Sequence, residues 1–464
     1  MVKVQVKGEP VYNRRARGFG ARPNGDGGVG RSFLFLQGPH GPFFRDLARR
    51  LKTEGAAVLK VGLSRADDRE WGRAGPYQAF TGRRAEWADW LSKLLDERAI
   101  TDVVLYGDTR PAHAEAIALA KARGLVVHCF EEGYLRPFWV TYERGGANGN
   151  SRLMEFSVPM MSEASRIADY DLDAAPPIWG AAWRHAFHGF RHHFDVLFFN
   201  QAYPHHQAHR PTSLSRELAL YLKRLLVLPI LTPQRGFRER RLLRSGKLYH
   251  LVLLQLAIDS SMRAHSDYAD VATFVRECVA AFATGAPKDH HLVFKSHPFE
   301  DGREKLASVV AAAAKEHGLA KRIVFLEGGK LGPLLDRARS AVTINSTAGQ
   351  QALWRGLPLS VHGAAVYDKP EFCAEGDLAT FFRRPFAPDA IAYREYRQFL
   401  LMTTQIRGGF YSRRGRRDAV DAALPKILDP LDPYDRLLKI AGARRDELAA
   451  QSDIAVLPVE NRLG

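Results

Sequence analysis

Cysteine is scarce in this sequence. The chain has 464 residues and three cysteines, Cys129, Cys278 and Cys373, which lie far apart. This spacing fits neither a disulfide framework nor a zinc site, so we expect free thiols in a reducing compartment. Cys129 and Cys278 lie in apolar surroundings, and we interpret them as packing residues.

Long apolar runs are absent as well. No stretch approaches the ~18 uninterrupted apolar residues that a membrane span needs. Residues 1–31 are basic and rich in glycine, without the apolar segment of a secretory signal, and we interpret them as a disordered arm. These absences predict a cytoplasmic protein that is at most associated with a membrane surface.

Acidic residues are in deficit. The chain has 51 Asp and Glu against 67 Lys and Arg, a formal net charge of +16 at pH 7. Such an excess points to an anionic partner: nucleic acid, an anionic membrane surface or a phosphorylated substrate. Composition alone does not choose among them, but no recognition motif supports nucleic acid, so we expect no such partner.

The chain is longer than a single core usually grows, so two domains are expected. Apolar runs alternate with helical patterns in two series, which is typical of parallel sheets covered by helices. We predict an α/β fold with two Rossmann-like domains facing across a cleft, as in GT-B glycosyltransferases. One large sheet is the alternative. The predicted parts are an acceptor and catalytic domain at 32–235, a nucleotide-sugar domain at 236–390, and a helical segment at 391–464 that braces the first domain.

The sharpest chemical signal follows the apolar run 125–130, where Glu131 and Glu132 stand directly before Gly133. A buried parallel strand that ends in two carboxylates delivers charge to the crevice where open α/β sheets place their chemistry. Arg136 is within reach as a counter-charge. We predict that Glu132, Glu131 and Arg136 are catalytic. The alternative is that the two glutamates begin a solvated loop.

Polar residues also follow the predicted strand 102–106. Asp108 is either a further catalytic residue or a cap of the next helix. Other polar residues are predicted to line the cleft or to contact the acceptor. These are His40, Arg110, His113, Asn148, Tyr203, His205, His206, Asp259 and Arg263.

Histidines are frequent between residues 154 and 210. No pair at i, i+4 carries the carboxylate pattern of a known zinc motif, so we predict no metal site there. We expect several of these histidines to be hydrogen-bond donors that face an anionic substrate.

The second series also places polar residues after its predicted strands. Lys295 ends one strand, and the loop Asn345–Gly349 joins another strand to a helix. Small residues and hydroxyls in such a loop suit a phosphate held on backbone N–H groups. The predicted donor-binding residues are Lys295, His297, Pro298, Asn345, Ser346, Thr347 and Gly349.

A dense basic segment separates the two series. Arg238, Arg240, Arg241 and Arg244 stand against a single acidic residue, Glu239, and follow a strongly apolar stretch. An apolar stripe beside such a cluster suits a helix that rests on anionic lipid. The alternative is a linker helix packed on the core with a solvated face.

Five sequence blocks occur in a fixed order: Gln37–Phe44, Gly107–His113, Phe130–Pro137, Lys295–Pro298 and Asn345–Gly349. Together they resemble the bacterial capsule polysaccharide synthesis and export family, of the KpsS/LipB type. The resemblance covers about residues 32–410.

This resemblance implies a retaining β-Kdo transferase that uses CMP-Kdo to start the poly-Kdo linker on lyso-phosphatidylglycerol. It places the protein on the cytoplasmic face of the inner membrane. It also implies that His297 contacts the CMP phosphate, with Lys295 nearby, and that the Asn345–Gly349 loop completes the nucleotide site. Related KpsC-type enzymes have an aspartate where this chain has Glu132, so Glu132 is a nucleophile, a base or an orienting group.

We expect no cofactor and no metal requirement, because CMP-activated sugars do not in general need a metal for departure and the sequence shows no DxD-like motif. The expected partners are CMP-Kdo, the glycolipid acceptor, the anionic inner-membrane surface and other capsule assembly proteins. The alternative function is a non-enzymatic export or scaffold protein that binds capsule lipid. Polar clusters at several strand ends favour the enzyme.

Overall fold

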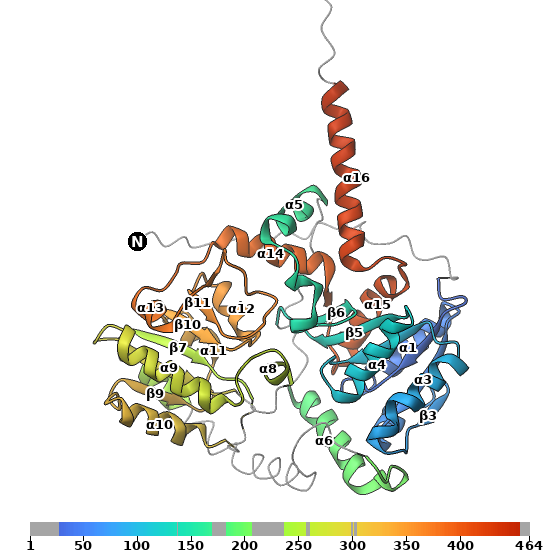
Figure 1. Ribbon diagram of the computed structural model, residues 1–464, viewed down its shortest axis with the longest axis horizontal. Helices are drawn as coiled ribbons and strands as arrows, with labels where there is room; N and C mark the ends of the chain where they lie inside the picture. Colours follow the sequence, from blue (N-terminus) through green and yellow to red (C-terminus); the bar gives the residue numbers. More distant parts are fainter. Residues whose placement is uncertain are drawn as a thin grey trace, which may run out of the picture.

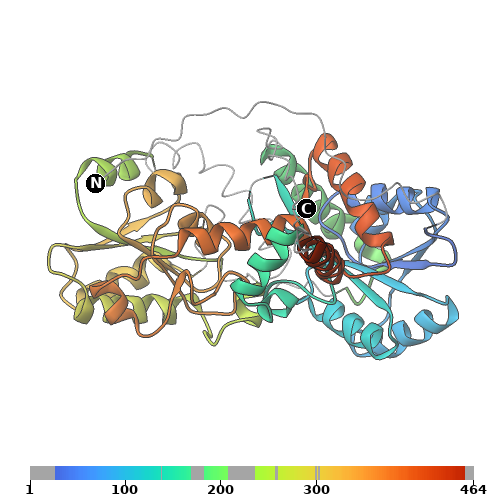
Figure 2. The ribbon, with the colours of Figure 1, turned by 90° about the horizontal axis from the view of Figure 1, so that it is seen from above.

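The computed structural model describes residues 27–136, 138–168, 182–206, 236–256, 260–297, 300 and 304–454. Two separate sheets organise the chain, and each carries helices on its faces (Figure 1). Figure 2 shows the two units side by side, with the orange helix α14 (Ala390–Thr403) running between them. The predicted α/β class with two Rossmann-like units is therefore confirmed.

The first sheet has the order β13-β6-β5-β4-β1-β2-β3. Strands β1 to β5 run parallel, whereas β6 is antiparallel to both β5 and β13. The strands are β1 (Ser32–Phe35), β2 (Ala57–Gly62), β3 (Tyr77–Ala79), β4 (Asp102–Tyr106), β5 (Val126–Glu132), β6 (Trp139–Arg144) and β13 (Gln405–Arg407). The helices of this unit are α1 (Phe43–Thr53), α2 (Arg65–Trp71), α3 (Trp87–Glu97) and α4 (Pro111–Ala122).

The two faces of this sheet are covered by different helices. Side chains alternate along a strand, so Phe33 and Phe35 pack with α1, α2 and α15 (Arg413–Leu428), while Leu34 and Leu36 pack with α3 and α4. Burial on both faces explains why β1 is apolar from Phe33 onward. Cys129 is a free thiol in the core that contains Leu34, and Cys278 is a free thiol in a core of the second unit. Their predicted packing role is therefore confirmed.

The second sheet is parallel throughout, with the order β12-β11-β10-β7-β8-β9. Its strands are β7 (Tyr249–Leu253), β8 (His291–Lys295), β9 (Ile323–Leu326), β10 (Ser340–Thr343), β11 (Leu359–Val361) and β12 (Cys373–Ala374). Its helices are α8 (Ser260–Ala264), α9 (Val271–Gly285), α10 (Leu306–Glu316), α11 (Leu331–Leu335), α12 (Ala348–Leu353) and α13 (Leu378–Arg383). None of the helices in the described part of the chain has the length and apolarity to cross a bilayer.

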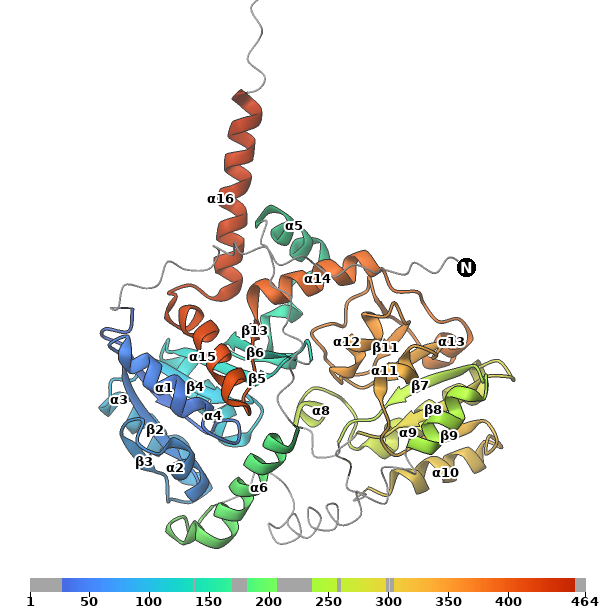
Figure 3. The same ribbon diagram turned by 180° about the vertical axis from the view of Figure 1, so that it is seen from behind.

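The last part of the chain returns to the first unit. Helix α14 packs against α5 (Val158–Ala168), β13 extends the first sheet, and α15 lies beside α1 (Figure 3). Helix α16 (Pro433–Ile454) then projects away from both units (Figure 1). The sequence predicted a helical segment here, and the strand β13 is an addition that no local pattern indicated.

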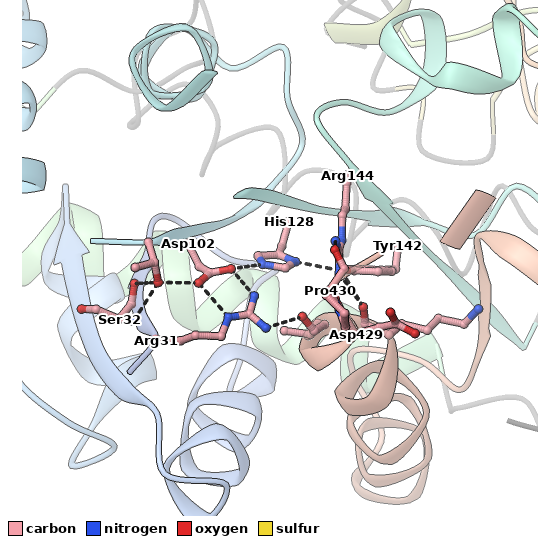
Figure 4. A network of polar contacts seen from close by, with 11 residues as sticks. Arg31, Ser32, Asp102, His128, Tyr142, Arg144, Asp429 and Pro430 are labelled. Atoms are coloured by element: carbon pink, nitrogen blue, oxygen red, sulfur yellow. Dashed lines mark hydrogen bonds and ion pairs between the residues drawn. The ribbon is translucent and has the colours of Figure 1, made fainter. Parts of the chain in front are cut away.

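A polar network clamps this returning segment onto the first sheet (Figure 4). Arg31 donates to the carbonyl of Ile427 at 3.0 Å, and Arg144 donates to that of Lys426 at 3.0 Å, both near the C-terminal end of α15. Cations are favourable at a helix C-terminus, where the backbone carbonyls carry partial negative charge.

Asp102 holds one of these two arginines. Its carboxylate accepts from Arg31 Nε at 3.1 Å and lies 2.7 Å from His128 Nε2. Burial lowers the pKa of His128 to about 4, so the ring is neutral at pH 7; it donates through Nε2 and accepts from the Tyr142 hydroxyl at 2.8 Å. Burial alone would raise the pKa of Asp102, but the hydrogen bonds from His128 and Arg31 hold it well below its usual range.

Candidate active site

The sheet places Glu131 and Glu132 at the carboxyl end of β5, an interior strand between β4 and β6. Successive side chains of a strand point to opposite faces of the sheet, so the two carboxylates lie among different neighbours. Glu132 lies on the face of Phe130 and the tyrosines of the first sheet, whereas Glu131 lies on the face of Cys129 and Gly107. The strand end therefore presents two acidic groups in two different environments.

Glu132 is oriented by two phenol groups. Its Oε1 accepts from the Tyr411 hydroxyl at 2.8 Å and from the Tyr106 hydroxyl at 3.4 Å. Burial and the neighbouring glutamates raise the pKa of both tyrosines well above the usual value, so both hydroxyls keep their protons and donate. Such donors orient the carboxylate and stabilise its charge.

His185 and Arg136 lie close to this acidic group. The His185 ring, on α6 (Ala182–Phe199), stacks on Tyr411 with centroids 4.2 Å apart. Burial lowers the pKa of His185, and the charge of Glu132 opposes that shift. Arg136 is exposed, donates to the Gly133 carbonyl at 3.2 Å, and its charge lowers the pKa of both Tyr411 and His185. A cation therefore stands near Tyr411 and His185, and its role as counter-charge of Glu132 stays a prediction.

Glu131 has a pKa suited to proton transfer. Burial raises it to about 7; the charges of Glu132 and Asp108 add to that shift, whereas the Glu132 N–H at 2.9 Å and the charge of Arg110 oppose it. Arg110 is itself held by Gln37, whose Oε1 accepts from it at 2.8 Å. A carboxyl that titrates near neutral pH can serve as a general acid or base.

Asp108 and His113 hold backbone segments around this group. Asp108 accepts from Ala147 N at 2.9 Å and from Asn150 Nδ2 at 3.0 Å, which fixes the loop after β6. The interpretation of Asp108 as a cap is wrong, because α4 begins after Arg110. His113 Nδ1 donates to the Gly107 carbonyl at 2.7 Å, and burial lowers its pKa to about 3, so it is neutral.

The loop that Asp108 fixes also contacts the second unit. Asn148 N donates to the Tyr134 hydroxyl at 2.6 Å, and a Cβ at Gly149 would stand only 2.5 Å from the His265 ring. The His265 carbonyl in turn accepts from Asn345 Nδ2 at 3.3 Å. The loop beside the acidic strand end therefore touches the segment that supports the predicted donor loop.

The predicted donor residues lie at neighbouring strand ends. Lys295 ends β8 and is buried, and Asn345 follows β10, with β7 between the two strands. Asn345 exchanges two hydrogen bonds with Gln255, at 2.8 and 3.1 Å. Because the carboxyl ends of parallel strands meet at one edge of a sheet, the structure brings these two candidates together.

The other predicted donor-binding residues, and two cleft candidates of the second unit, differ in burial and in their contacts. Ser346 Oγ accepts from Ala348 N at 3.2 Å, and Thr347 is the N-cap residue directly before α12. Gly349 is buried, and a Cβ there would lie 2.7 Å from the Tyr367 hydroxyl, so packing requires glycine. His297 is half-buried after β8, and Arg263 is exposed on α8. Pro298 and Asp259 lie outside the described residues.

The remaining cleft candidates gather elsewhere on the first unit. Tyr203 shares a 2.5 Å hydrogen bond with Tyr77 of β3, His206 Nδ1 lies 2.8 Å from the Leu63 carbonyl after β2, and His205 is exposed. His40 packs against His192 on α6. Since β4 and β1 separate β2 from β5, the structure does not bring Tyr203 and His206 to Glu132.

Several residues of the site were not predicted from the sequence. Tyr106 ends β4 two residues before Asp108, so its position at a strand end was a usable signal. Tyr411 lies 279 positions from Glu132. In the second unit, His265 holds Asn345 through its carbonyl and Gln255 holds it through its side-chain amide. No local pattern connects these residues to the acidic pair.

Comparison with known proteins gives consistent matches. A family model described as "Capsule polysaccharide biosynthesis protein" matches residues 101–411. "Capsule polysaccharide export protein KpsS" of Escherichia coli is 34% identical over 400 residues, which are 82% of this chain and 97% of that protein. "Capsule polysaccharide modification protein LipB" of Neisseria meningitidis serogroup B is 30% identical over 400 residues, 82% of this chain and 92% of that protein.

Among solved structures, the "beta Kdo 2,7 transferase" KpsC of Thermosulfurimonas dismutans matches with a TM-score of 0.40 and 12% identity. That match covers 85% of this chain and 99% of the solved one.

The raised pKa of Glu131 predicts a pH-dependent stability. A carboxyl that binds its proton more tightly when folded contributes stability that is lost as the pH rises from its ordinary value of 4.5 to about 7. Glu131→Gln resembles the protonated form. It should match the parent at pH 5 and exceed it at pH 8 by on the order of 2–3 kcal/mol in free energy of unfolding.

Urea unfolding at both pH values measures this difference. Glu97→Gln, at an exposed glutamate that ends α3, is the matched control and should follow the parent at both pH values. An identical pH dependence in the two variants would show that Glu131 titrates as an ordinary surface carboxyl.

Proposed function

This chain belongs to the capsule polysaccharide biosynthesis family, and from that premise we propose that it is a retaining β-Kdo glycosyltransferase. The proposed donor is CMP-Kdo, and the proposed acceptor is (lyso)phosphatidylglycerol, on which the enzyme starts the poly-Kdo linker of the capsule. The observation that carries the proposal is the acidic end of β5. There Glu132 is oriented by two tyrosine hydroxyls and Glu131 has a pKa of about 7.

In the first step Glu132 acts as the nucleophile. The bond between the anomeric carbon of Kdo and the phosphate oxygen of CMP breaks, and its electron pair leaves with the phosphate. A carboxylate oxygen of Glu132 then bonds to that carbon from the opposite face and gives a covalent glycosyl ester, as in retaining glycosidases. Hydrogen bonds from Tyr411 and Tyr106 fix the direction of the carboxylate for this attack.

In the second step a hydroxyl of the acceptor attacks the same carbon and the ester to Glu132 breaks. The hydroxyl must lose a proton, and we assign that proton to the carboxylate of Glu131. A base with a pKa near 7 is present in both forms at neutral pH, which is favourable for taking a proton and releasing it again. Two displacements at one carbon retain its configuration.

The second unit is proposed to hold CMP. Lys295 ends β8, and His297 follows it, on the edge where Asn345 follows β10. Cationic and N–H groups at that edge would stabilise the charge that develops on the departing phosphate. The contact between Gly149 and His265 supports the proposal that donor and acidic groups face one another. With such donors available, departure is proposed to need neither metal nor cofactor.

Membrane attachment is proposed for two surfaces of the described chain. The helix at residues 236–244 packs through Glu239 and Leu242, while its arginines and Phe237, which is 66% exposed, face outward. Packing on the core and a basic outer face are therefore compatible. On α6, four exposed phenylalanines repeat at helical spacing: Phe187, Phe190, Phe194 and Phe198. Cationic and aromatic side chains suit the cytoplasmic face of the inner membrane, where other capsule assembly proteins are the proposed further partners.

A transfer assay tests the proposed reaction. Purified protein with CMP-Kdo and a soluble lyso-phosphatidylglycerol analogue should release CMP and glycosylate the analogue. Glu132→Gln should abolish transfer while retaining CMP binding, because an amide cannot form the ester. His297→Ala should instead lose CMP binding. Lipid binding by the parent protein without CMP release would favour a non-enzymatic scaffold.

Vesicle binding tests the proposed attachment. Replacement of Arg238, Arg240, Arg241 and Arg244 by glutamine should weaken binding to anionic vesicles by about two to three orders of magnitude at low salt, since each cation contributes ~1 kcal/mol. Transfer to a soluble acceptor should be spared. The control removes four exposed cations elsewhere: Arg49, Lys93, Arg98 and Lys121. Equal weakening in both variants would mean that net charge alone, and not this helix, attracts the protein to lipid.

A further inference from the structure

Three side chains with metal-binding chemistry meet in the first unit, where α2 and α6 lie beside the loop after β1. His40 lies in the loop between β1 and α1, Glu70 lies on α2, and His192 lies on α6. One nitrogen or carboxylate oxygen of each lies within 4.8 Å of the others. His192 Nδ1 is 3.1 Å from Glu70 Oε1, and the rings of His40 and His192 are 4.1 Å apart at 87°.

This donor set has a definite preference among metals. Two imidazoles and one carboxylate are typical ligands of zinc and related transition metals, whereas magnesium and calcium prefer oxygen alone. In a tetrahedral zinc site with bonds of about 2.0–2.1 Å, neighbouring ligand atoms stand roughly 3.3 Å apart. The separation between His192 and Glu70 already has this size, so small side-chain movements would complete the set.

The three residues stand on elements that other contacts hold together. Figure 3 shows α6 beside α2. Arg69, next to Glu70, pairs with Asp195 of α6 and lies over the Phe199 ring at 4.5 Å. Asn200 Oδ1 accepts from Arg65 N at 2.9 Å. The two helices are therefore positioned without a metal, which gives the site a preorganised frame.

The site is sheltered and also accessible. His192 is buried, and the Glu70 side chain is 19% exposed. Glu70 also lines a small pocket with Gly38, Pro39 and Gly41, which belong to the loop that carries His40. The Glu70 carboxylate therefore faces a small pocket, whose other charged lining residues are Asp67, Arg45 and Lys60.

We propose that His40, Glu70 and His192 form a binding site for one divalent transition-metal ion of the zinc class. Three protein ligands leave a further position for water or for an oxygen atom of a ligand in the pocket. The bound ion would fasten α6 to the loop between β1 and α1. This site lies in the first unit, away from the predicted donor residues of the second, so it is independent of the proposed departure of CMP.

Metal titration of the untagged full chain tests this site. After removal of metals with a chelator, the parent should bind one equivalent of Zn²⁺ by calorimetry. One equivalent of Co²⁺ should give the visible absorption of a nitrogen- and oxygen-ligated site. Zn²⁺ binding should be weakened at least about 10- to 100-fold in each of His192→Ala, His40→Ala and Glu70→Gln. Loss of a residue that only hydrogen-bonds to a metal ligand already weakens binding by that factor, and loss of a ligand itself should cost at least as much.

His193→Ala is the matched control. The His193 ring lies 5.6 Å from the rings of both His40 and His192, but His193 is not one of the three ligands, so the variant loses a ring contact and no ligand atom and should bind within a few-fold of the parent. Thermal unfolding separates ligand loss from misfolding: Zn²⁺ should raise the melting temperature of the parent and of His193→Ala but not that of folded Glu70→Gln. Absence of saturable Zn²⁺ binding by the parent, or equal binding by Glu70→Gln, would overturn the proposal.

Discussion

The hydrogen bond from Tyr411 to Glu132 joins residues 279 positions apart, and the proposed chemistry depends on it. Tyr411 stands between β13 and α15, so its position requires that the end of the chain return to the first sheet. That return is secured by β13 on the edge of β6 and by Arg31 and Arg144 on the carbonyls at the end of α15. The last fifth of the chain therefore completes a site whose acidic groups lie near residue 130.

A second constraint is the contact between the two units. A continuous apolar core contains residues of both, from Tyr134 and Leu153 in the first to Leu251 and Val293 in the second. Lys369 of the second unit donates to two carbonyls of the first, at residues 153 and 156. This shared core keeps the loop after β6 against His265, whose carbonyl accepts from Asn345 of the predicted donor loop.

The sequence predicted the features that follow from local pattern. Alternating apolar runs predicted both sheets, and the abrupt change from apolar to acidic residues predicted the strand end at Glu131 and Glu132. The sequence pattern does not tell which polar side chains form hydrogen bonds that stabilise the fold. Asp108 and His113 were predicted as site residues from their place after a strand, and the structure adds that each also holds a backbone group. Tyr411 and the Glu70 carboxylate beside His192 were missed, because tertiary folding alone brings them to their partners.

The central claim is that Glu132 bonds covalently to the transferred sugar, and a mass measurement of the intact enzyme tests it most directly. Brief exposure to CMP-Kdo without acceptor should add the mass of one Kdo residue, and digestion should locate that addition on the peptide that contains Glu132. Glu132→Gln should show no addition. An adduct on another carboxylate, or efficient transfer by the Gln variant, would contradict the account and leave Glu132 with a positioning role.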